Sequence, residues 1–248
     1  MRVIEQSAEI QDWRDLNLYE RVEIAARVCR RSECKGNAEG FVRGLVQKGH
    51  YPPLEFARFA VSDLDCAHVR HIRDSSSWSL SSAVWVSRLM ATYPALVEDL
   101  HYVPEPGEIV PDDTWIPVLF VTSRTISHQL VRYRNDICFA QESQRHVRYD
   151  KDGIEVIEPP GLNAKARGWW YCACRRAEIN YRRMIEAGAK AEQARAVLPG
   201  CTATRILAYA SPAEWRHIFS QRCDKHADPQ MRALMEPLQA RMQELRLI

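Results

Sequence analysis

The sequence has no marked excess of charge of one sign and no long apolar run. Its 34 basic residues are balanced by 32 acidic ones, which leaves a formal net charge of +2. A general nucleic-acid binder carries a concentrated excess of positive charge, and a membrane span needs roughly 18 or more consecutive apolar residues. We therefore expect neither nucleic acid nor a membrane among the partners of this chain.

A secretory leader is not evident either, because the opening segment MRVIEQSAEIQDW has no apolar core. Cysteine occurs at eight positions, namely 29, 34, 66, 138, 172, 174, 201 and 223. Outside an oxidising compartment thiols stay reduced, and most of them behave as small buried hydrophobes. The sequence thus predicts a cytoplasmic protein with reduced cysteines.

The spacing of a metal site is also missing. Cys66, His68 and His71 lie close together, but structural zinc sites need a pair of cysteines with a matching second pair. Cys172 and Cys174 would point to different sides of a helix. We expect surface histidines and buried thiols at these positions, and no metal.

Lysine is scarce, since 6 of the basic residues are Lys and 28 are Arg. Arginines cluster between Thr122 and Tyr149, in TSRTISHQLVRYRNDICFAQESQRHVRY. A guanidinium offers five N–H donors in a planar fork, which suits phosphate oxygens and the edges of planar rings. Ser143 has His146 three residues on, but lacks the G-x-S-x-G turn of a serine nucleophile. The segment therefore predicts a site that binds and polarises a nucleotide, while a phosphate-bearing cofactor supplies the chemistry.

Hydrophobic spacing and turn signals predict a mixed α/β (α+β) fold. Helices are expected over residues 19–30, 78–91, 123–132, 163–187, 190–197, 211–223 and 229–245, and between an N-cap at Asn37 and a stop at Gly49. Strands are expected at residues 116–121 and 202–209, with a hairpin joining 147–149 to 154–157 and a turning segment at 49–60 that leads into a further strand. Residues 102–113 predict a loop, and residues 135–144 give no clear pattern. We expect one domain over residues 1–248, a small sheet flanked by long helices.

Several blocks along the chain form an ordered pattern. Arg132-Tyr133-Arg134 is followed by an eight-residue spacer and by Ser143-Gln144-Arg145. The other blocks are AARVC at 25–29, GHYPPLEF at 49–56, ISHQLVR at 126–132, QARAVLP at 193–199 and EWRHIFSQR at 214–222. Together they resemble the flavin-dependent thymidylate synthases, whose signature is Arg-His-Arg, seven residues, and Ser followed shortly by Arg.

The resemblance implies the flavin-dependent thymidylate synthase-like fold and a homotetramer whose subunits share active sites. It implies C5-methylation of a uracil nucleotide monophosphate, UMP or dUMP. Methylene-tetrahydrofolate would donate the carbon, reduced FAD the hydride, and NADPH would reduce the flavin. The chain lacks the Pro-Cys pair that carries the nucleophile in the classical, flavin-free synthases, which agrees with a reaction that needs no enzyme thiol.

The resemblance also assigns roles to single residues. Arg222 matches the catalytic arginine that favours ionisation at N3 of the uracil, as expected of a guanidinium beside a developing anion in a dry pocket. The implied substrate-binding residues are Gln129, Arg132, Gln141, Glu142, Ser143, Arg145, Arg195 and Arg222, of which Arg145 and Arg195 suit the phosphate. The implied cofactor-binding residues are Arg58, Arg132, Tyr133, Arg134, Gln141, Ser211, Ala213 and His217.

Some features depart from the family pattern. Tyr133 and Phe56 stand where the family usually has His, the spacer before Ser143 is one residue longer, and residues 63–114 form a long insertion. A tyrosine can still stack on isoalloxazine. We expect the longer spacer to form a bulge beside the nucleotide, with room for a 2′-hydroxyl. That would suit UMP as well as dUMP, as in the variant of this family that methylates UMP in polyoxin (nucleoside antibiotic) biosynthesis.

Three alternatives stay open. The chain could be a strict dUMP-only synthase, a catalytically silent homologue that binds flavin or nucleotide, or an Arg-rich RNA-binding module. A bound flavin that NADPH never bleaches would mark the silent homologue. A steep salt dependence of RNA binding would mark the RNA-binding module.

Overall fold

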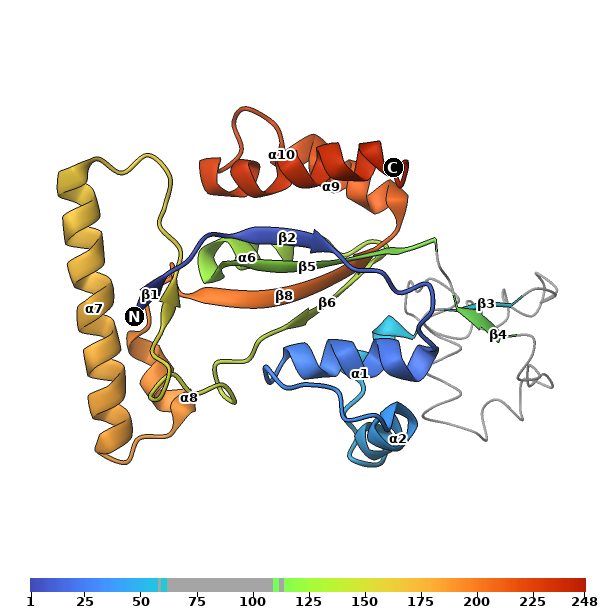
Figure 1. The fold of residues 1–248 in the computed structure, drawn as a ribbon, viewed down its shortest axis with the longest axis horizontal. Helices are drawn as coiled ribbons and strands as arrows, with labels where there is room; N and C mark the ends of the chain where they lie inside the picture. Colours follow the sequence, from blue (N-terminus) through green and yellow to red (C-terminus); the bar gives the residue numbers. More distant parts are fainter. Residues whose placement is uncertain (58, 62–108, 112–113) are drawn as a thin grey trace. The chain divides into compact units, whose positions relative to one another are not determined.

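The computed structural model describes residues 1–57, 59–61, 109–111 and 114–248 (Figure 1). They belong to two compact units: the first comprises Met1–Gln11, Val28–Arg31 and Ile116–Ile248, and the second comprises Asp12–Arg27 and Ser32–Trp115. A single domain over residues 1–248 stays a prediction. Most of the expected insertion at 63–114, and the helix expected at 78–91, lie outside the described residues. In the described part, no helix combines the length and the apolarity needed to cross a bilayer.

The first unit is built on a four-stranded antiparallel sheet. Its strands lie in the order β2 (Ser7–Ile10), β5 (Ile116–Ser123), β8 (Ala203–Ala210) and β6 (Ile137–Gln141). β5 and β8 pair along their whole length, from Ile116 opposite Ala210 to Ser123 opposite Ala203. The strands predicted at 116–121 and 202–209 are therefore confirmed, and β6 forms where the sequence gave no clear pattern.

One face of this sheet carries the main core. Successive strand residues alternate between faces, and every second side chain of β5 and β8 is buried on this face: Ile116, Val118, Phe120, Ile206, Ala208 and Ala210. Three helices cover it, α6 (Arg124–Leu130), α9 (Pro212–Arg222) and α10 (Pro229–Glu244). Figure 1 shows α9 and α10 side by side over the sheet. Ser123, Ser211 and Asp228 cap the three helices by accepting backbone N–H bonds, which confirms the predicted starts.

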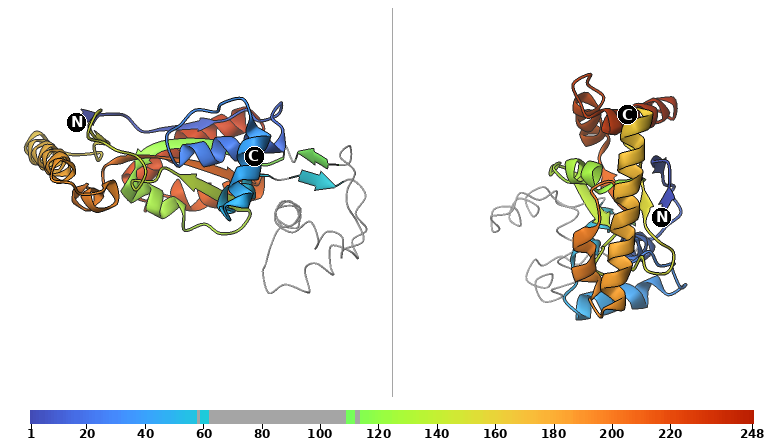
Figure 2. Two further views of the ribbon diagram at one scale, coloured as in Figure 1. Left: turned by 90° about the horizontal axis from the view of Figure 1, so that it is seen from below. Right: turned by 90° about the vertical axis from the view of Figure 1, so that its left-hand side faces the viewer.

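The helix α7 (Ala164–Glu186) begins at Asn163, whose side chain accepts a hydrogen bond from the Ala166 N–H. The right-hand view in Figure 2 shows it as one long rod. Its buried side chains are Cys174, Glu178 and Tyr181. They lie with Tyr149, Ile154, Val156 and Ala194 in a second apolar cluster. α8 (Ala191–Ala194) and the 3-10 helix η2 (Arg195–Val197) follow, so the helices predicted at 163–187 and 190–197 are confirmed.

The predicted hairpin between residues 147–149 and 154–157 is wrong. β7 (Glu155–Val156) pairs in parallel with β1 (Arg2–Val3), and residues 147–149 form no strand. Residues 150–153 do turn, with the Gly153 N–H donating to the Tyr149 carbonyl at 3.1 Å and a φ of +77° at Gly153. The turn was therefore predictable from nearby residues. The pairing was not, because β1, the strand that pairs with β7, lies far away in the sequence.

The second unit contains all but the last residue of α1 (Leu18–Val28). It also contains α2 (Ala38–Gln47), the 3-10 helix η1 (Pro52–Phe56), and strands β3 (Phe59–Val61) and β4 (Ile109–Pro111). Val22, Val42 and Leu54 form its apolar cluster. The Asn37 cap is confirmed, because its side chain accepts a hydrogen bond from the Gly40 N–H at 3.0 Å. The loop predicted over 102–113 is wrong at β4, which pairs with β3 in an antiparallel ladder that no local signal indicates.

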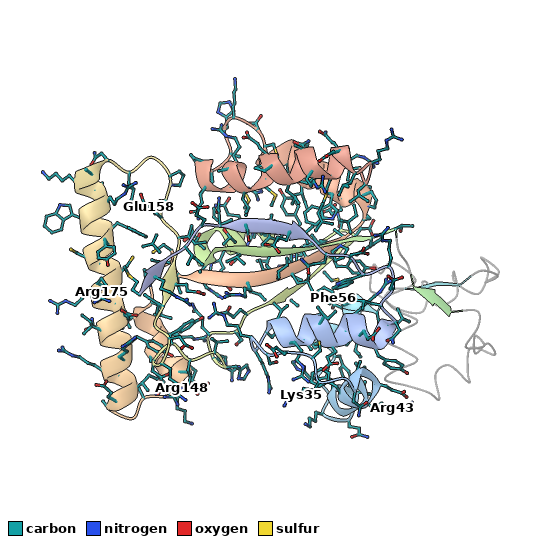
Figure 3. All side chains as sticks on the ribbon, in the orientation of Figure 1. Lys35, Arg43, Phe56, Arg148, Glu158 and Arg175 are labelled. Carbon is teal, nitrogen blue, oxygen red and sulfur yellow. The ribbon has the colours of Figure 1, made fainter. Side chains whose placement is uncertain are left out.

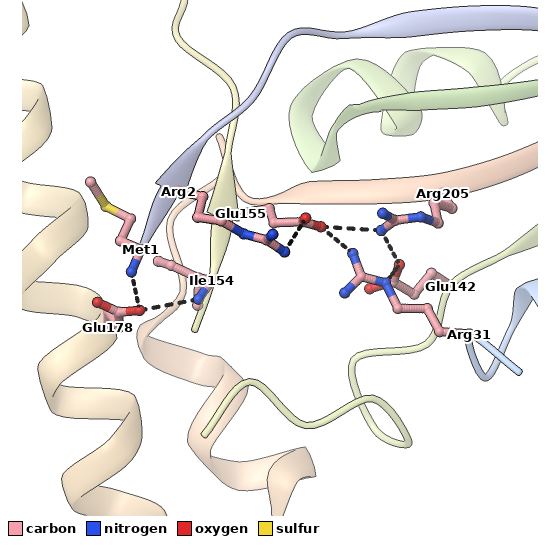
Figure 4. Close-up of polar contacts among 8 residues, drawn as sticks. All are labelled: Met1, Arg2, Arg31, Glu142, Ile154, Glu155, Glu178 and Arg205. Atoms are coloured by element: carbon pink, nitrogen blue, oxygen red, sulfur yellow. Dashed lines mark hydrogen bonds and ion pairs between the residues drawn. The ribbon is translucent and has the colours of Figure 1, made fainter. Parts of the chain in front are cut away.

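Glu178 ties α7 to the first strand of the chain. Its carboxylate accepts hydrogen bonds from the Met1 ammonium at 2.6 Å and the Ile154 N–H at 3.2 Å (Figure 4). Arg175, on the same helix (Figure 3), donates to it at 3.0 Å. Burial opposes ionisation of this carboxyl, but these donors outweigh burial and lower the pKa of Glu178 below its ordinary value. The carboxylate is 4% exposed, so these bonds are largely shielded from water.

Glu178→Gln is expected to lower the free energy of unfolding by about 2 kcal/mol near neutral pH. Because the folded-state pKa is depressed, this contribution is present above the unfolded value of 4.5 and is lost as the pH falls through the folded value. Urea denaturation of parent and variant at about pH 7 and about pH 3 measures the difference. Glu236→Gln, at an exposed pair with Arg232, is the control. A difference of equal size at both pH values would contradict the assignment.

Candidate functional site

Arg222, the last residue of α9, lies against the end of α6. Its Nη1 donates to the Gln129 side-chain oxygen at 3.4 Å, and its Nη2 donates to the Gln129 carbonyl at 3.3 Å. The Gln129 side-chain nitrogen donates to Asp228 at 3.0 Å, which fixes the amide. The Nε–H of Arg222 is buried and has no hydrogen-bond partner among the described residues. Since a buried donor without an acceptor is costly, this guanidinium can take an acceptor from outside the described residues.

Tyr133 joins the end of α6 to α9. The guanidinium carbon of Arg222 lies 5.3 Å from the centre of its ring, and the His217 ring meets it edge-on at 5.8 Å. The Tyr133 hydroxyl donates to the Gln221 side chain at 3.1 Å. Burial raises the pKa of Tyr133, and the Arg222 guanidinium opposes this shift. Three of the predicted residues, Tyr133, His217 and Arg222, thus form one contiguous group.

The start of α9 carries two further residues of the predicted cofactor set. The Ser211 hydroxyl accepts the Glu214 N–H at 3.1 Å as the helix cap, so it has a structural role of its own. Ala213 is exposed in the first turn. His217, exposed one turn on, lies four positions after Ala213 on the same helix, so these two residues share one face of α9.

β6 separates two predicted residues onto opposite faces of the sheet. The Gln141 amide points to the α6 side, where it donates to the Ser127 hydroxyl at 2.7 Å and to the Thr204 hydroxyl at 3.3 Å. Glu142, the next residue, points to the other side, as strand alternation requires. The two residues therefore do not meet in one pocket wall, although they are adjacent in sequence.

Glu142 is part of a buried ion-pair network (Figure 4). It accepts hydrogen bonds from the Tyr149 hydroxyl at 2.6 Å, from Arg31 Nε at 2.7 Å and from Arg205 at 3.4 Å. Both arginines also pair with Glu155. Burial raises the pKa of Glu142, and the bonds from Tyr149 and Arg31 partly offset this. With its side chain fully enclosed, the Glu142 carboxylate is occupied by donors of the chain itself.

Ser143 and Arg145 form the turn that follows. The Ser143 N–H donates to the Cys29 carbonyl at 2.9 Å, and its hydroxyl accepts the Arg145 N–H at 3.3 Å. The exposed Arg145 guanidinium reaches Glu192 on α8 at 3.5 Å. Burial raises the pKa of the Cys29 thiol, as expected of a packed rather than reactive cysteine.

Arg195 starts η2, and the segment after it runs back to the start of α6. The Thr125 N–H donates to the Gly200 carbonyl at 3.1 Å, and a side chain at Gly200 would lie 2.6 Å from the Thr125 hydroxyl. This close approach brings Arg195 near Arg124. Burial lowers the pKa of Arg124, and the positive charge of Arg195 lowers it further against the opposing effect of Tyr149. Neither guanidinium is ion-paired with a carboxylate of the described residues. The two neighbouring positive charges therefore favour the binding of an anion between them.

The remaining predicted residues are the arginines on either side of Tyr133. Arg132 and Arg134 are exposed, and no hydrogen bond or ion pair holds either guanidinium within the described part of the chain. Arg58 lies outside the described residues.

The predicted bulge beside Ser143 is wrong. β6 pairs with β8 residue for residue, from Ile137 opposite Ala210 to Gln141 opposite Ile206, and the ladder continues with the Glu142 N–H on the Arg205 carbonyl. The backbone instead bends before the strand, at Asp136, whose φ is +42°. A turn tolerates an extra residue at lower cost than a paired strand does, and Asp is among the residues that adopt this conformation.

Sequence reasoning assigned no role to Arg124, Arg31 or Arg205. Arg124 stands in the arginine-rich segment directly after the helix cap, which was the available signal. Arg31 follows the AARVC block but pairs with a residue 111 positions away, and no local pattern indicates such a contact.

Phe56, where the family usually has His, is fully buried against Trp13 in the second unit (Figure 3).

No metal cluster is found among the residues that the structure describes, since no three His, Cys, Asp or Glu side chains gather there. Cys66, His68 and His71 fall outside them. Cys172 is exposed and Cys174 is buried. They lie on opposite sides of α7 as expected, but the buried thiol expected at Cys172 is wrong.

Comparisons of sequence match about half of this chain. The thymidylate synthase complementing protein family matches residues 116–245, and the chain belongs to this family. A flavin-dependent thymidylate synthase of Geobacter sulfurreducens is 37% identical over 114 residues, 45% of this chain and 49% of the relative. One of Mycobacterium tuberculosis is 32% identical over 129 residues, 45% of this chain and 50% of the relative. The chain spans about half the length of the curated relatives it matches, and the resemblance drawn from the sequence is confirmed.

Two solved structures share the fold. The UMP/dUMP methylase PolB from Streptomyces cacaoi bound with 5-Br dUMP superposes with a TM-score of 0.53 at 16% identity, over 99% of this chain and 93% of that one. The same methylase bound with 5-Br UMP gives a TM-score of 0.52 at 14% identity, over 99% and 92%. At such identities the likeness establishes the fold alone, and the predicted mixed α/β class is confirmed.

Proposed function

We propose that this protein methylates a uracil nucleotide monophosphate at C5, with methylene-tetrahydrofolate as carbon donor and FAD as cofactor reduced by NADPH. Membership in the thymidylate synthase complementing protein family supports this assignment, as do curated relatives named flavin-dependent thymidylate synthase. The assignment covers residues 1–248 as one functional domain, in a homotetramer whose subunits share sites.

The observation that carries the proposal is the guanidinium of Arg222. Gln129 holds two of its nitrogens, and its buried Nε–H lacks an acceptor among the described residues. A uracil carbonyl or the ionised N3 would supply that acceptor. Negative charge that develops on the ring is stabilised by a preorganised cation in a water-poor site, so Arg222 is the proposed catalytic residue.

The phosphate is proposed to bind at Arg195, with Arg145 and Arg124. Arg195 and Arg124 form no ion pair with a described carboxylate, and Arg145 has one exposed contact with Glu192. Planar guanidinium forks match phosphate oxygens in pairs of hydrogen bonds. Ser143, held by the Cys29 carbonyl beside Arg145, is proposed to donate its hydroxyl to the same group.

The residues present fit a flavin on two grounds. The exposed His217 ring, set edge-on against the buried Tyr133 ring, offers an aromatic surface, and exposed Arg132 and Arg134 are suited to the diphosphate. These four residues, with α9, would hold FAD, and Gln141 would contact both ligands. When bound, FAD supplies the hydride that reduces the transferred carbon. The chain itself binds the nucleotide, orients its ring and stabilises charge at N3, and no protein nucleophile is required.

We propose that both UMP and dUMP are substrates. The support is the shared fold with PolB, a methylase of both nucleotides by its description. The bulge that was expected to make room for a 2′-hydroxyl gives no support, because β6 is regular. Turnover of each nucleotide by purified, FAD-loaded protein tests the proposal, and product from both is expected. Product from dUMP alone would assign a strict thymidylate synthase, and bound flavin without product from either would assign a silent homologue.

A further inference from the structure

Two cysteines distant in sequence meet inside the first unit. Cys174 is buried on α7, and Cys201 is half-buried in the turn between η2 and β8. Their sulfur atoms lie 3.4 Å apart, although 27 positions separate the residues. Both belong to the apolar cluster between α7 and the β1–β7 pair, where Trp170 and Leu198 pack around them.

We propose that Cys174 and Cys201 are a redox-modifiable pair that closes to an intramolecular disulfide when the protein meets a peroxide. The Cys201 thiolate attacks one peroxide oxygen, the O–O bond breaks, and a sulfenic acid forms on Cys201 with release of hydroxide. The Cys174 sulfur then attacks the Cys201 sulfur, the S–O bond breaks, and water leaves. Two thiols and one hydrogen peroxide thus give one disulfide and two waters.

The electrostatics of the pair assign these two roles. Either sulfur can donate the hydrogen bond between them. When the buried Cys174 keeps its hydrogen, the bond stabilises a thiolate at Cys201 and lowers the pKa of Cys201 despite its burial. The same bond, together with burial, raises the pKa of Cys174. The more exposed sulfur is therefore the more nucleophilic one, and the buried sulfur is placed to resolve the intermediate.

The new bond would link α7 covalently to the turn before β8, where the two now meet through packing and a hydrogen bond. Cys201 follows Gly200, whose carbonyl holds the start of α6, and lies six positions after Arg195. Closing a loop of this length restricts the unfolded chain, and we expect the oxidised protein to unfold about 5–10 °C above the reduced one.

Mass spectrometry after trypsin digestion tests the proposal on the parent chain. Cleavage after Arg167 and Arg175 yields GWWYCACR, and cleavage after Arg195 and Arg205 yields AVLPGCTATR. Protein treated with hydrogen peroxide is expected to lose two hydrogens in intact mass, to yield these two peptides as a linked pair, and to return to separate peptides after a thiol reductant. Oxygen added at cysteines without this linked pair would overturn the proposal.

The first peptide also contains Cys172, so a matched variant decides which sulfur is bonded. Cys172→Ser, two residues away on the exposed side of α7, is expected to keep the link, and Cys174→Ser to lose it. A link that persists in Cys174→Ser and vanishes in Cys172→Ser would overturn the assignment. Fragmentation of the linked pair from the parent gives the same answer without any variant. These readouts do not require nucleotide binding and stay valid whatever the protein methylates.

Discussion

Replacing Arg222 with Ala is expected to lower the turnover of uracil nucleotide methylation by a factor of about 10²–10³, the loss typical of removing one preorganised charge-stabilising group. The reason is local. Arg222 has a buried Nε–H without a partner in the described part of the chain and two nitrogens held by Gln129, so a lysine or a water cannot reproduce its fork. Steady-state methylation of dUMP and UMP by FAD-loaded variant and parent measures the effect.

Two controls separate catalysis from folding in this comparison. Arg216→Ala removes an exposed arginine from the same helix and is expected to leave turnover near that of the parent. Arg222→Lys keeps the charge but loses the planar fork, and we expect it to fall between parent and Arg222→Ala. If a correctly folded Arg222→Ala variant methylates as fast as the parent, Arg222 has no catalytic role.

Glu142→Ala is expected to lower the free energy of unfolding by about 3–5 kcal/mol, the cost of breaking a buried ion pair from one side. The substitution would leave the Tyr149 hydroxyl without its acceptor and would remove the shared partner of Arg31 and Arg205. Urea denaturation at neutral pH measures the loss.

The control for Glu142 is Glu244→Ala, which removes a carboxylate from an exposed pair with Arg241 and is expected to change stability by less than about 1 kcal/mol. Arg31→Ala should destabilise in the same way, because Arg31 bridges Glu142 and Glu155. The double variant should lose less than the sum of the single losses, since both changes act on one network. Strict additivity would mean that the two residues do not act together.

The elements that the sequence predicted correctly are those with local causes. Ser123, Asn163 and Ser211 each cap a helix through a side chain three residues from its donor, and such signals are read within one turn. The pairing of β7 and the presence of β4 were not predicted, because their partners β1 and β3 lie far away along the chain. Strand pairing depends on these distant segments, which a local pattern does not encode.

The same difference between local signals and long-range contacts applies to the residues of the site. Arg222 and Tyr133 were identified through family motifs, and the structure brings them together with Gln129 and His217. The motif did not indicate that Glu142 points away from Gln141 into a network with Arg31. Strand alternation could have predicted the opposite faces, had the sequence given a clear strand at residues 137–141. The ion partners required the tertiary fold.

The methylation itself is measured by incubating the purified protein with FAD, NADPH, methylene-tetrahydrofolate and dUMP, followed by mass analysis of the nucleotide. We expect a product heavier than dUMP by one CH₂ group, formed only when all four compounds are present. A nucleotide of unchanged mass from folded, flavin-loaded protein would contradict this expectation.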